Sequence, residues 1–222
     1  FLMPNIDSST IRKMNALCKE YPGKIFPMIG LHPTSVKDNY LDELNIIKKA
    51  VKKQKYYAIG EIGIDLYWDK TYAKEQDFAL RFQLNMAKEY HLPVAIHTRS
   101  SFEESIEILK EEYDENLTGV FHCFGGTYQQ AMDIIEMGFY LGIGGVVTFK
   151  NSGLDKVIEN IDLKHIILET DAPYLTPSPY RGMRNESSYL PLIAQKVAEL
   201  KKVSLEEVAD ITTYNAKQLF KF

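Results

Sequence analysis

Four ionisable residues stand where apolar runs end, and their side chains are of the kinds that bind metal ions. They are Glu61 after Ala-Ile-Gly, His97 after Pro-Val-Ala-Ile, His122 after Gly-Val-Phe and Asp171 after Ile-Ile-Leu-Glu-Thr. If these runs are buried strands, an unpaired ionisable group at their ends is costly to bury. A divalent cation compensates the carboxylates and is coordinated by the imidazoles, so the pattern predicts a metal site. This ligand set suits Zn²⁺, Mn²⁺ or Mg²⁺ without choosing among them.

Each of these residues has a plainer interpretation when it is taken alone. A single histidine at the end of an apolar run is more often a hydrogen-bonded core residue than a ligand. Glu61 could be a salt-bridge partner, and Asp171 could cap the turn into Ala172-Pro173. The coincidence of ionisable residues at four predicted strand ends favours a metal site over these separate interpretations. The carboxyl ends of parallel barrel strands converge on one face, which is where barrel active sites are built.

Further candidate residues follow these apolar runs. His32, in Gly-Leu-His-Pro, is predicted as a substrate contact. Arg181 and Arg184, in a proline-containing loop after the last run, suit an oxygen-rich anion such as phosphate, with a solvated surface loop as the alternative. Tyr67 and Trp68 are predicted either to stack a base or to pack under a helix, and the pattern leaves that choice open.

Short apolar runs alternate with longer amphipathic ones, which is typical of βα units and a parallel sheet. The predicted strands are residues 1–6, 25–31, 57–62, 93–97, 119–123, 139–143 and 166–169. The predicted helices are residues 8–21, 41–53, 74–90, 101–113, 127–137, 154–160, 188–201 and 204–220. Asp7 is the expected cap of the first helix, Gly138 ends the fifth, and Phe78, Phe82 and Met86 form one apolar stripe along the third.

These elements predict a single domain over residues 1–222, with a TIM-type (β/α)8 barrel fold. Seven predicted strands are one short of a closed barrel, and the chain opens abruptly on an apolar run, so we expect one βα unit before Phe1. An open doubly wound sheet is the competing fold. It predicts a glycine-rich phosphate turn after an early strand, and no such Gly-x-Gly-x-x-Gly is present.

Composition limits the partners and the surroundings of the protein. The net charge of −4 and the pI of about 5.8 argue against a broad grip on duplex DNA, but not against binding one strand end at a metal. Two cysteines, Cys18 and Cys123, are too few for a disulfide scaffold, so a cytoplasmic location is expected. The chain contains no apolar run of about 18 residues, and neither a membrane nor an obligate protein partner is expected.

Taken in order, the motifs of this chain resemble the TatD family of metal-dependent deoxyribonucleases. The motifs are Gly-Leu-His-Pro from residue 30, Gly-Glu-Ile-Gly-Ile-Asp from residue 60, Ile-His-Thr-Arg from residue 96, Phe-His-Cys-Phe from residue 121, Gly-Ile-Gly-Gly from residue 142, Glu-Thr-Asp-Ala-Pro-Tyr-Leu from residue 169 and Arg-Gly-Met-Arg-Asn-Glu from residue 181. The resemblance implies a TIM-type barrel, two divalent metal ions and hydrolysis of phosphodiester bonds in DNA. The family's His-x-His pair on its first strand is not in this sequence, and Met183 and Ser187 depart from the family pattern.

By the same resemblance, Glu61 bridges the two ions and His97 and His122 complete the coordination of one. Asp171 holds the other ion and serves as the base for the attacking water. The expected activity is an exonuclease that prefers single-stranded DNA ends. The alternatives are an esterase or deacylase of the same fold, including a deacylase for aminoacyl-tRNA, and a non-catalytic binding barrel if the His-x-His pair is truly absent from the protein.

Overall fold

The computed structural model describes all of residues 1–222, which group into two compact units. Unit 1 comprises Phe1–Gly119 together with Phe220–Phe222, and unit 2 comprises Val120–Leu219. The prediction of one domain over residues 1–222 stays a prediction, since grouping by proximity does not measure cooperative unfolding.

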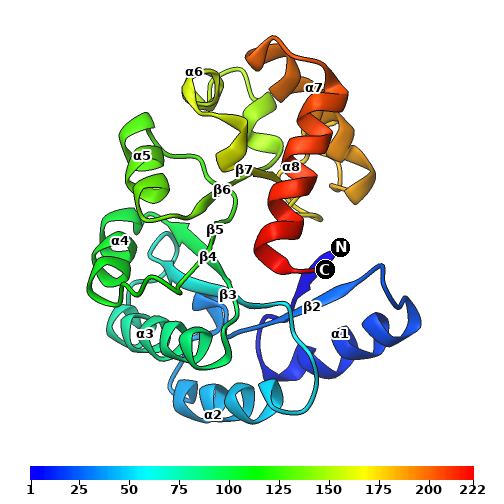
Figure 1. Cartoon of the computed structure of the whole chain (residues 1–222). Helices are drawn as coiled ribbons and strands as arrows, with labels where there is room; N and C mark the ends of the chain where they lie inside the picture. The colour runs from blue at the N-terminus through cyan, green and yellow to red at the C-terminus, as the bar shows by residue number, and fades with distance from the viewer. The chain divides into compact units, whose positions relative to one another are not determined.

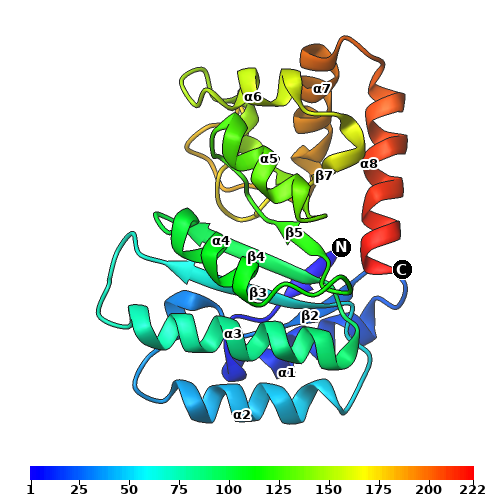
Figure 2. The same ribbon diagram turned by 60° about the vertical axis from the view of Figure 1, so that its left-hand side comes forward.

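Unit 1 is a parallel β/α arrangement with strands paired in chain order (Figure 1). Its strands are β1 (Leu2–Pro4), β2 (Phe26–Ile29), β3 (Ala58–Asp65) and β4 (Val94–Arg99). Its helices are α1 (Ser8–Glu20), η1 (Pro33–Ser35), α2 (Tyr40–Val51), α3 (Ala73–Tyr90) and α4 (Phe102–Glu111). Figure 2 shows α1, α2 and α3 on one side of these strands. β2 and the first halves of β3 and β4 are apolar and mostly buried, as expected for parallel strands covered on both faces.

Unit 2 continues the same alternation. Its strands are β5 (Gly119–Phe121), β6 (Tyr140–Ile143) and β7 (Ile166–Leu168), paired in parallel and in chain order. Its helices are α5 (Tyr128–Glu136), η2 (Gly145–Thr148), α6 (Leu154–Asn160), η3 (Leu163–His165), η4 (Ser187–Tyr189), α7 (Leu190–Lys201) and α8 (Leu205–Phe220). All seven predicted strands and all eight predicted α-helices are present, with shifts of up to three residues at their ends.

Local signals explain where several helices begin and end. Asp7 accepts the main-chain N–H of Ser9, and the Thr10 side chain reaches back to the Asp7 main chain, which completes a capping box before α1. Gly138 follows α5 with a φ of 80° and donates its N–H to Ile135, the geometry of a helix C-terminus closed by glycine. Both caps were predicted from the sequence and are confirmed.

The prediction of one apolar stripe along α3 is wrong in part. Met86 is buried, but Phe78 is 46% exposed, and its ring packs edge-on against Tyr40 of α2. The buried face of α3 includes two glutamines instead, Gln76 and Gln83. These amides bond to the main chain of unit 1, so the inward face of α3 combines apolar side chains with two hydrogen-bonded amides.

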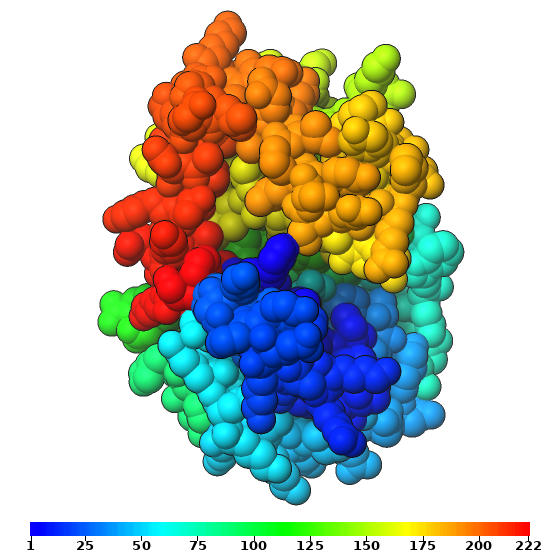
Figure 3. Space-filling model, turned by 90° about the vertical axis from the view of Figure 1, so that its right-hand side faces the viewer, coloured from blue at the N-terminus to red at the C-terminus, as the bar shows by residue number.

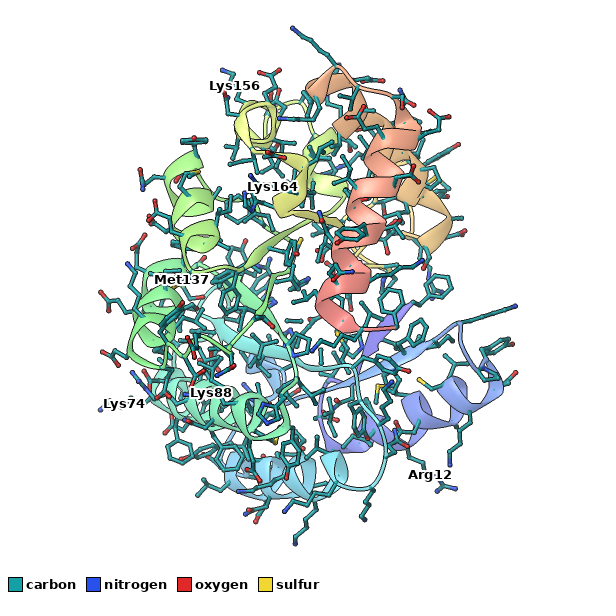
Figure 4. The ribbon with its side chains drawn as sticks, viewed as in Figure 1. Arg12, Lys74, Lys88, Met137, Lys156 and Lys164 are labelled. Atoms are coloured by element: carbon teal, nitrogen blue, oxygen red, sulfur yellow. The ribbon has the colours of Figure 1, made fainter.

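The helix surfaces are otherwise ordinary for a globular protein. Met14 is the one fully buried residue of α1, and this segment stands at the molecular surface in dark blue (Figure 3). Arg12 of α1 and Lys74 of α3 point away from the strands of unit 1 (Figure 4). None of the helices combines the length and the apolar composition that crossing a bilayer requires.

Candidate metal centre

Three polar side chains of unit 1 lie close together beside strands β2, β3 and β4. His32 comes from the segment after β2, Glu61 from β3 and His97 from β4, and their nitrogen and oxygen atoms all lie within 4.8 Å of one another. Nε2 of His32 is 3.6 Å from Oε2 of Glu61, and the rings of His32 and His97 meet edge-on at a centroid distance of 4.6 Å. A carboxylate between two imidazoles is a donor set that suits a divalent ion.

A bulge in β3 positions Glu61. The register between β3 and β4 shifts between Gly60 and Ile62, which leaves Glu61 as one extra residue on the β3 side. A bulge of this kind bends the strand and redirects a side chain. The sequence-based placement of Glu61 near a strand end was wrong, because β3 continues to Asp65. The bulge, and not the end of the strand, therefore decides where this carboxylate points.

His32 is oriented by a hydrogen bond to its own loop. It is the N-cap of η1, where its Nδ1 accepts the main-chain N–H of Thr34 at 3.2 Å and lies 2.7 Å from Thr34 Oγ1. Because Nδ1 is an acceptor there, a neutral His32 carries its proton on Nε2, on the side of Glu61. This orientation suits a hydrogen-bond donor to an anionic oxygen, and the role of His32 as a substrate contact stays a prediction.

Asp65 belongs to the same cluster, although the sequence analysis gave this last residue of the Gly-Glu-Ile-Gly-Ile-Asp motif no role. Its Oδ2 is 3.0 Å from Nε2 of His97, and its side chain is only 4% exposed. Burial raises the Asp65 pKa, but the His97 hydrogen bond, the N–H of Tyr67 and the charges of His97 and Arg99 outweigh it. The pKa therefore lies below its usual value, and Asp65 is a carboxylate at neutral pH. The predicted strand ended at residue 62, whereas β3 continues to Asp65, so the prediction did not place Asp65 beside His97.

Two buried amides of α3 hold the main chain that carries these residues. Gln83 accepts the N–H of Leu31 at 2.7 Å and donates to its carbonyl at 3.3 Å. Gln76 accepts the N–H of Asp65 at 2.8 Å and donates to its carbonyl at 3.2 Å. Gln83 thus satisfies the main-chain N–H and carbonyl of Leu31, the residue before His32. Gln76 does the same for the main chain of Asp65, whose carboxylate contacts His97.

In unit 2, His122 lies one residue beyond β5 and faces the carboxylate of Glu169, to which the sequence analysis gave no role. Nδ1 of His122 is 3.3 Å from Oε1 of Glu169, and the same oxygen accepts the N–H of Cys123 at 2.5 Å. A Cβ on Gly142 would come within 2.6 Å of the other Glu169 oxygen, so the glycine leaves room for this carboxylate. Glu169 thereby holds the His122 ring from its Nδ1 side.

Asp171 lies three residues beyond Leu168, the last residue of β7. Its φ is 55°, a left-handed conformation that aspartate adopts more readily than most residues. The turn that follows is closed by the main chain, with the N–H of Tyr174 donating to the Asp171 carbonyl at 2.9 Å. Whether the Asp171 carboxylate acts as a metal ligand or as a cap of this turn stays a prediction.

The loop after Asp171 borders an open pocket of about 410 Å³. Asn185 is 1% exposed and donates to the carbonyls of Thr170 and Tyr174 at 2.6 and 2.5 Å, which ties the loop to the end of β7. The pocket is lined by Ala172, Pro173, Arg184, Asn185, Glu186 and Ser187. The loop is therefore anchored rather than merely solvated.

The two arginines of this loop lie in different surroundings. Arg184 lines the pocket, whereas the Arg181 guanidinium lies 3.6 Å from the centre of the Phe149 ring. A guanidinium stacked on a ring keeps its donors at its edges, so Arg181 can still bind an anion. Contact of either arginine with phosphate stays a prediction.

Tyr67 and Trp68 form an exposed aromatic cluster with Arg99. The two rings are 53% and 76% exposed and meet edge-on at a centroid distance of 4.7 Å. The Arg99 guanidinium lies 4.0 Å from the centre of the Tyr67 ring and 5.5 Å from that of Trp68. Such exposure argues against packing under a helix, and the role in base stacking stays a prediction.

The structure therefore brings together part of the predicted set. In unit 1, Glu61 and His97 meet, with His32 and the newly found Asp65 beside them. His122 and Asp171 belong to unit 2, and their roles as ligands stay predictions. The nitrogen and oxygen donors that the structure describes fit a divalent ion, because they combine imidazole nitrogens with carboxylate oxygens.

Comparison with known proteins places the chain among metal-dependent hydrolases. The sequence profile of the family described as "TatD related DNase" matches residues 1–221. A relative from Bacillus subtilis, named "Uncharacterized metal-dependent hydrolase YabD", is 43% identical over 216 residues, which cover 97% of this chain and 84% of that protein.

Solved structures agree on the fold. The crystal structure of YjjV, a TatD homologue from Escherichia coli, matches with a TM-score of 0.93 and 28% identity, covering 100% of this chain and 86% of that one. A lactonase mutant from Deinococcus radiodurans matches in fold alone, with a TM-score of 0.62 and 12% identity over 92% of this chain and 75% of that one. The predicted TIM-type β/α-barrel class is confirmed.

Proposed function

Since this chain belongs to the TatD related DNase family, we propose that it hydrolyses phosphodiester bonds in DNA and prefers single-stranded ends. It is a metal-dependent hydrolase. The observation that carries the narrower proposal is a continuous set of contacts in unit 1. It runs from the exposed Trp68 and Tyr67 through the buried Asp65 to His97.

We propose Glu61, His97, His122 and Asp171 as the metal ligands. Imidazole nitrogens and carboxylate oxygens are accepted by Zn²⁺, Mn²⁺ and Mg²⁺ alike, and the family resemblance implies two ions. In unit 1, the separation of donor atoms within 4.8 Å supports this assignment. When bound, divalent ions lower the pKa of a water, polarise the scissile phosphate and stabilise the leaving oxygen.

The side chains have separate tasks in the proposed reaction. Asp171 orients the attacking water and accepts its proton. His32 presents its Nε2 proton to an oxygen of the phosphate, an orientation supported by its Thr34 contact. Arg184, which lines the pocket beside the loop, offsets the charge on non-bridging oxygens.

Charge and exposed rings support a single-stranded end as the substrate. A protein with a net charge of −4 gains little from long-range attraction to phosphates, on which duplex binding depends heavily. Stacking of one base on an aromatic side chain is worth about 1–3 kcal/mol and needs an unpaired base. Trp68 and Tyr67 offer exposed rings for this contact, and Arg99 beside them offers a cation for the adjoining phosphate.

The proposal is tested by digestion of end-labelled single strands, blunt duplex and closed circular single strands with Mg²⁺ or Mn²⁺. We expect the linear single strand to be digested fastest and the closed circle to resist. Rapid cutting of the circle would show that no end is required. Turnover of p-nitrophenyl esters or aminoacyl-tRNA without any cutting of DNA would replace the nuclease by an esterase or deacylase.

Trp68→Ala tests the stacking platform. We expect KM for the single strand to rise about 5- to 30-fold, equivalent to about 1–2 kcal/mol of stacking, with little change in kcat. Tyr113→Ala is the matched control, since Tyr113 is 56% exposed but follows the C-terminus of α4. An unchanged KM in Trp68→Ala would remove Trp68 from the substrate contacts.

A further inference from the structure

We propose that Asp65 is a positioning residue that holds His97 in the tautomer with its proton on Nε2 and its lone pair on Nδ1. Nδ1 is then the nitrogen that His97 offers to a metal ion. The inference rests on the proposed role of His97 as a ligand. The sequence motif that ends at Asp65 did not by itself give this residue a role.

The contact between Asp65 and His97 determines which ring nitrogen of His97 carries the proton. Oδ2 of Asp65 is 3.0 Å from Nε2 of His97, a normal hydrogen-bond distance. A carboxylate has no proton to donate, so Nε2 must be the donor. In a neutral imidazole the other nitrogen then carries the lone pair, which is the form that coordinates a metal.

The carboxylate is itself held in one orientation. Its Oδ1 accepts the main-chain N–H of Tyr67 at 3.0 Å, which leaves Oδ2 to face His97. Its main chain is bonded at both N–H and carbonyl by Gln76. With its side chain 4% exposed, Asp65 has little freedom to turn away.

A carboxylate that accepts the far N–H of a metal-binding histidine does two things. It fixes the tautomer and the direction of the ring, and it makes the coordinating nitrogen more basic. The position of Asp65 on β3, next to β4 and its His97, allows both effects.

Asp65→Asn tests the assignment, because it replaces the carboxylate with a side chain of the same size. Tyr67 N–H still selects the amide oxygen, so the amide NH₂ takes the place of Oδ2. That NH₂ can only donate, and it forces Nε2 of His97 to accept and Nδ1 to carry the proton. Metal binding must then first displace that proton.

The first measurement is calorimetric titration of the metal-free protein with Mn²⁺ or Zn²⁺. We expect Asp65→Asn to bind the ion about 10- to 100-fold more weakly, the usual effect of losing such a partner. Asp69→Asn is the matched control. Asp69 accepts the N–H of Thr71 at 2.8 Å in the same way, but its side chain is 49% exposed and pairs with Lys37 rather than with an imidazole. Equal affinity in Asp65→Asn and the unmodified protein would overturn the assignment.

The second measurement reads the tautomer in the metal-free protein. Long-range ¹H–¹⁵N correlation on histidine-labelled protein, with the His97 signal assigned from a His97→Asn variant, should show the proton on Nε2. A proton on Nδ1 in the unmodified protein would overturn the proposal even if Asp65→Asn failed to fold. Neither measurement uses DNA, so a protein that binds the ion with this tautomer but cuts no DNA would refute only the proposed function.

Discussion

Substitution of single side chains tests the proposed metal centre. We expect Glu61→Gln, His122→Ala and Asp171→Asn each to reduce hydrolysis by at least about 100-fold, since loss of a partner that merely orients a ligand already costs about 10- to 100-fold. The fold should persist, because ligands at the catalytic face of a barrel are held by the scaffold. Turnover of single-stranded DNA by the purified variants measures the loss of hydrolysis, and their circular dichroism measures whether the fold persists.

His91→Asn is the control for these variants. His91 is exposed at the end of α3 with a φ of 52°, a conformation that asparagine tolerates well. We expect this variant to keep normal turnover. Near-normal turnover in Asp171→Asn would instead remove Asp171 both as base and as ligand.

At the scale of elements, helix α3 is coupled to the strand ends by its glutamines. Gln83 is fully buried, and its amide bonds both the N–H and the carbonyl of Leu31. Gln83→Leu keeps the bulk but leaves both groups without a partner, at a cost of about 1–3 kcal/mol each. We expect Tm to fall by about 2–4 °C for each kcal/mol, as measured by scanning calorimetry of the metal-free protein.

The same substitution on a solvent-facing helix position serves as the comparison. Gln129 of α5 is exposed and donates to Asp133 one turn later. Gln129→Leu should leave Tm nearly unchanged, because water replaces the lost partner. If Gln83→Leu were as stable as Gln129→Leu, the buried bonds to Leu31 would not be needed to hold the strand end.

For the whole molecule, binding of metal should appear as added stability. A ligand that binds only the folded state at about 100 times its Kd contributes about 2.7 kcal/mol. For a chain of this size, this corresponds to a rise in Tm of about 5–10 °C. Scanning calorimetry with Mn²⁺, Zn²⁺ or Mg²⁺, and again after chelation, measures the rise and its reversal. A Tm indifferent to all three ions would contradict the metal centre itself.

The sequence by itself determined the alternation of strands and helices, the barrel class and the residue types of the metal centre. These features are local. Apolar runs, caps such as Asp7 and Gly138, and polar residues such as His97 after an apolar run can all be recognised within a few neighbouring residues. The ordered motifs then identified the family.

Only the tertiary structure decided how these residues are aimed and supported. The bulge at Glu61 depends on the register between β3 and β4, and the contact of Asp65 with His97 joins residues 32 positions apart. Glu169 reaches Cys123 across 46 positions, and Gln83 reaches Leu31 across 52. A hydrogen bond between distant segments leaves no periodic trace in the chain, because the polar partner looks like any solvent-exposed residue until folding buries it.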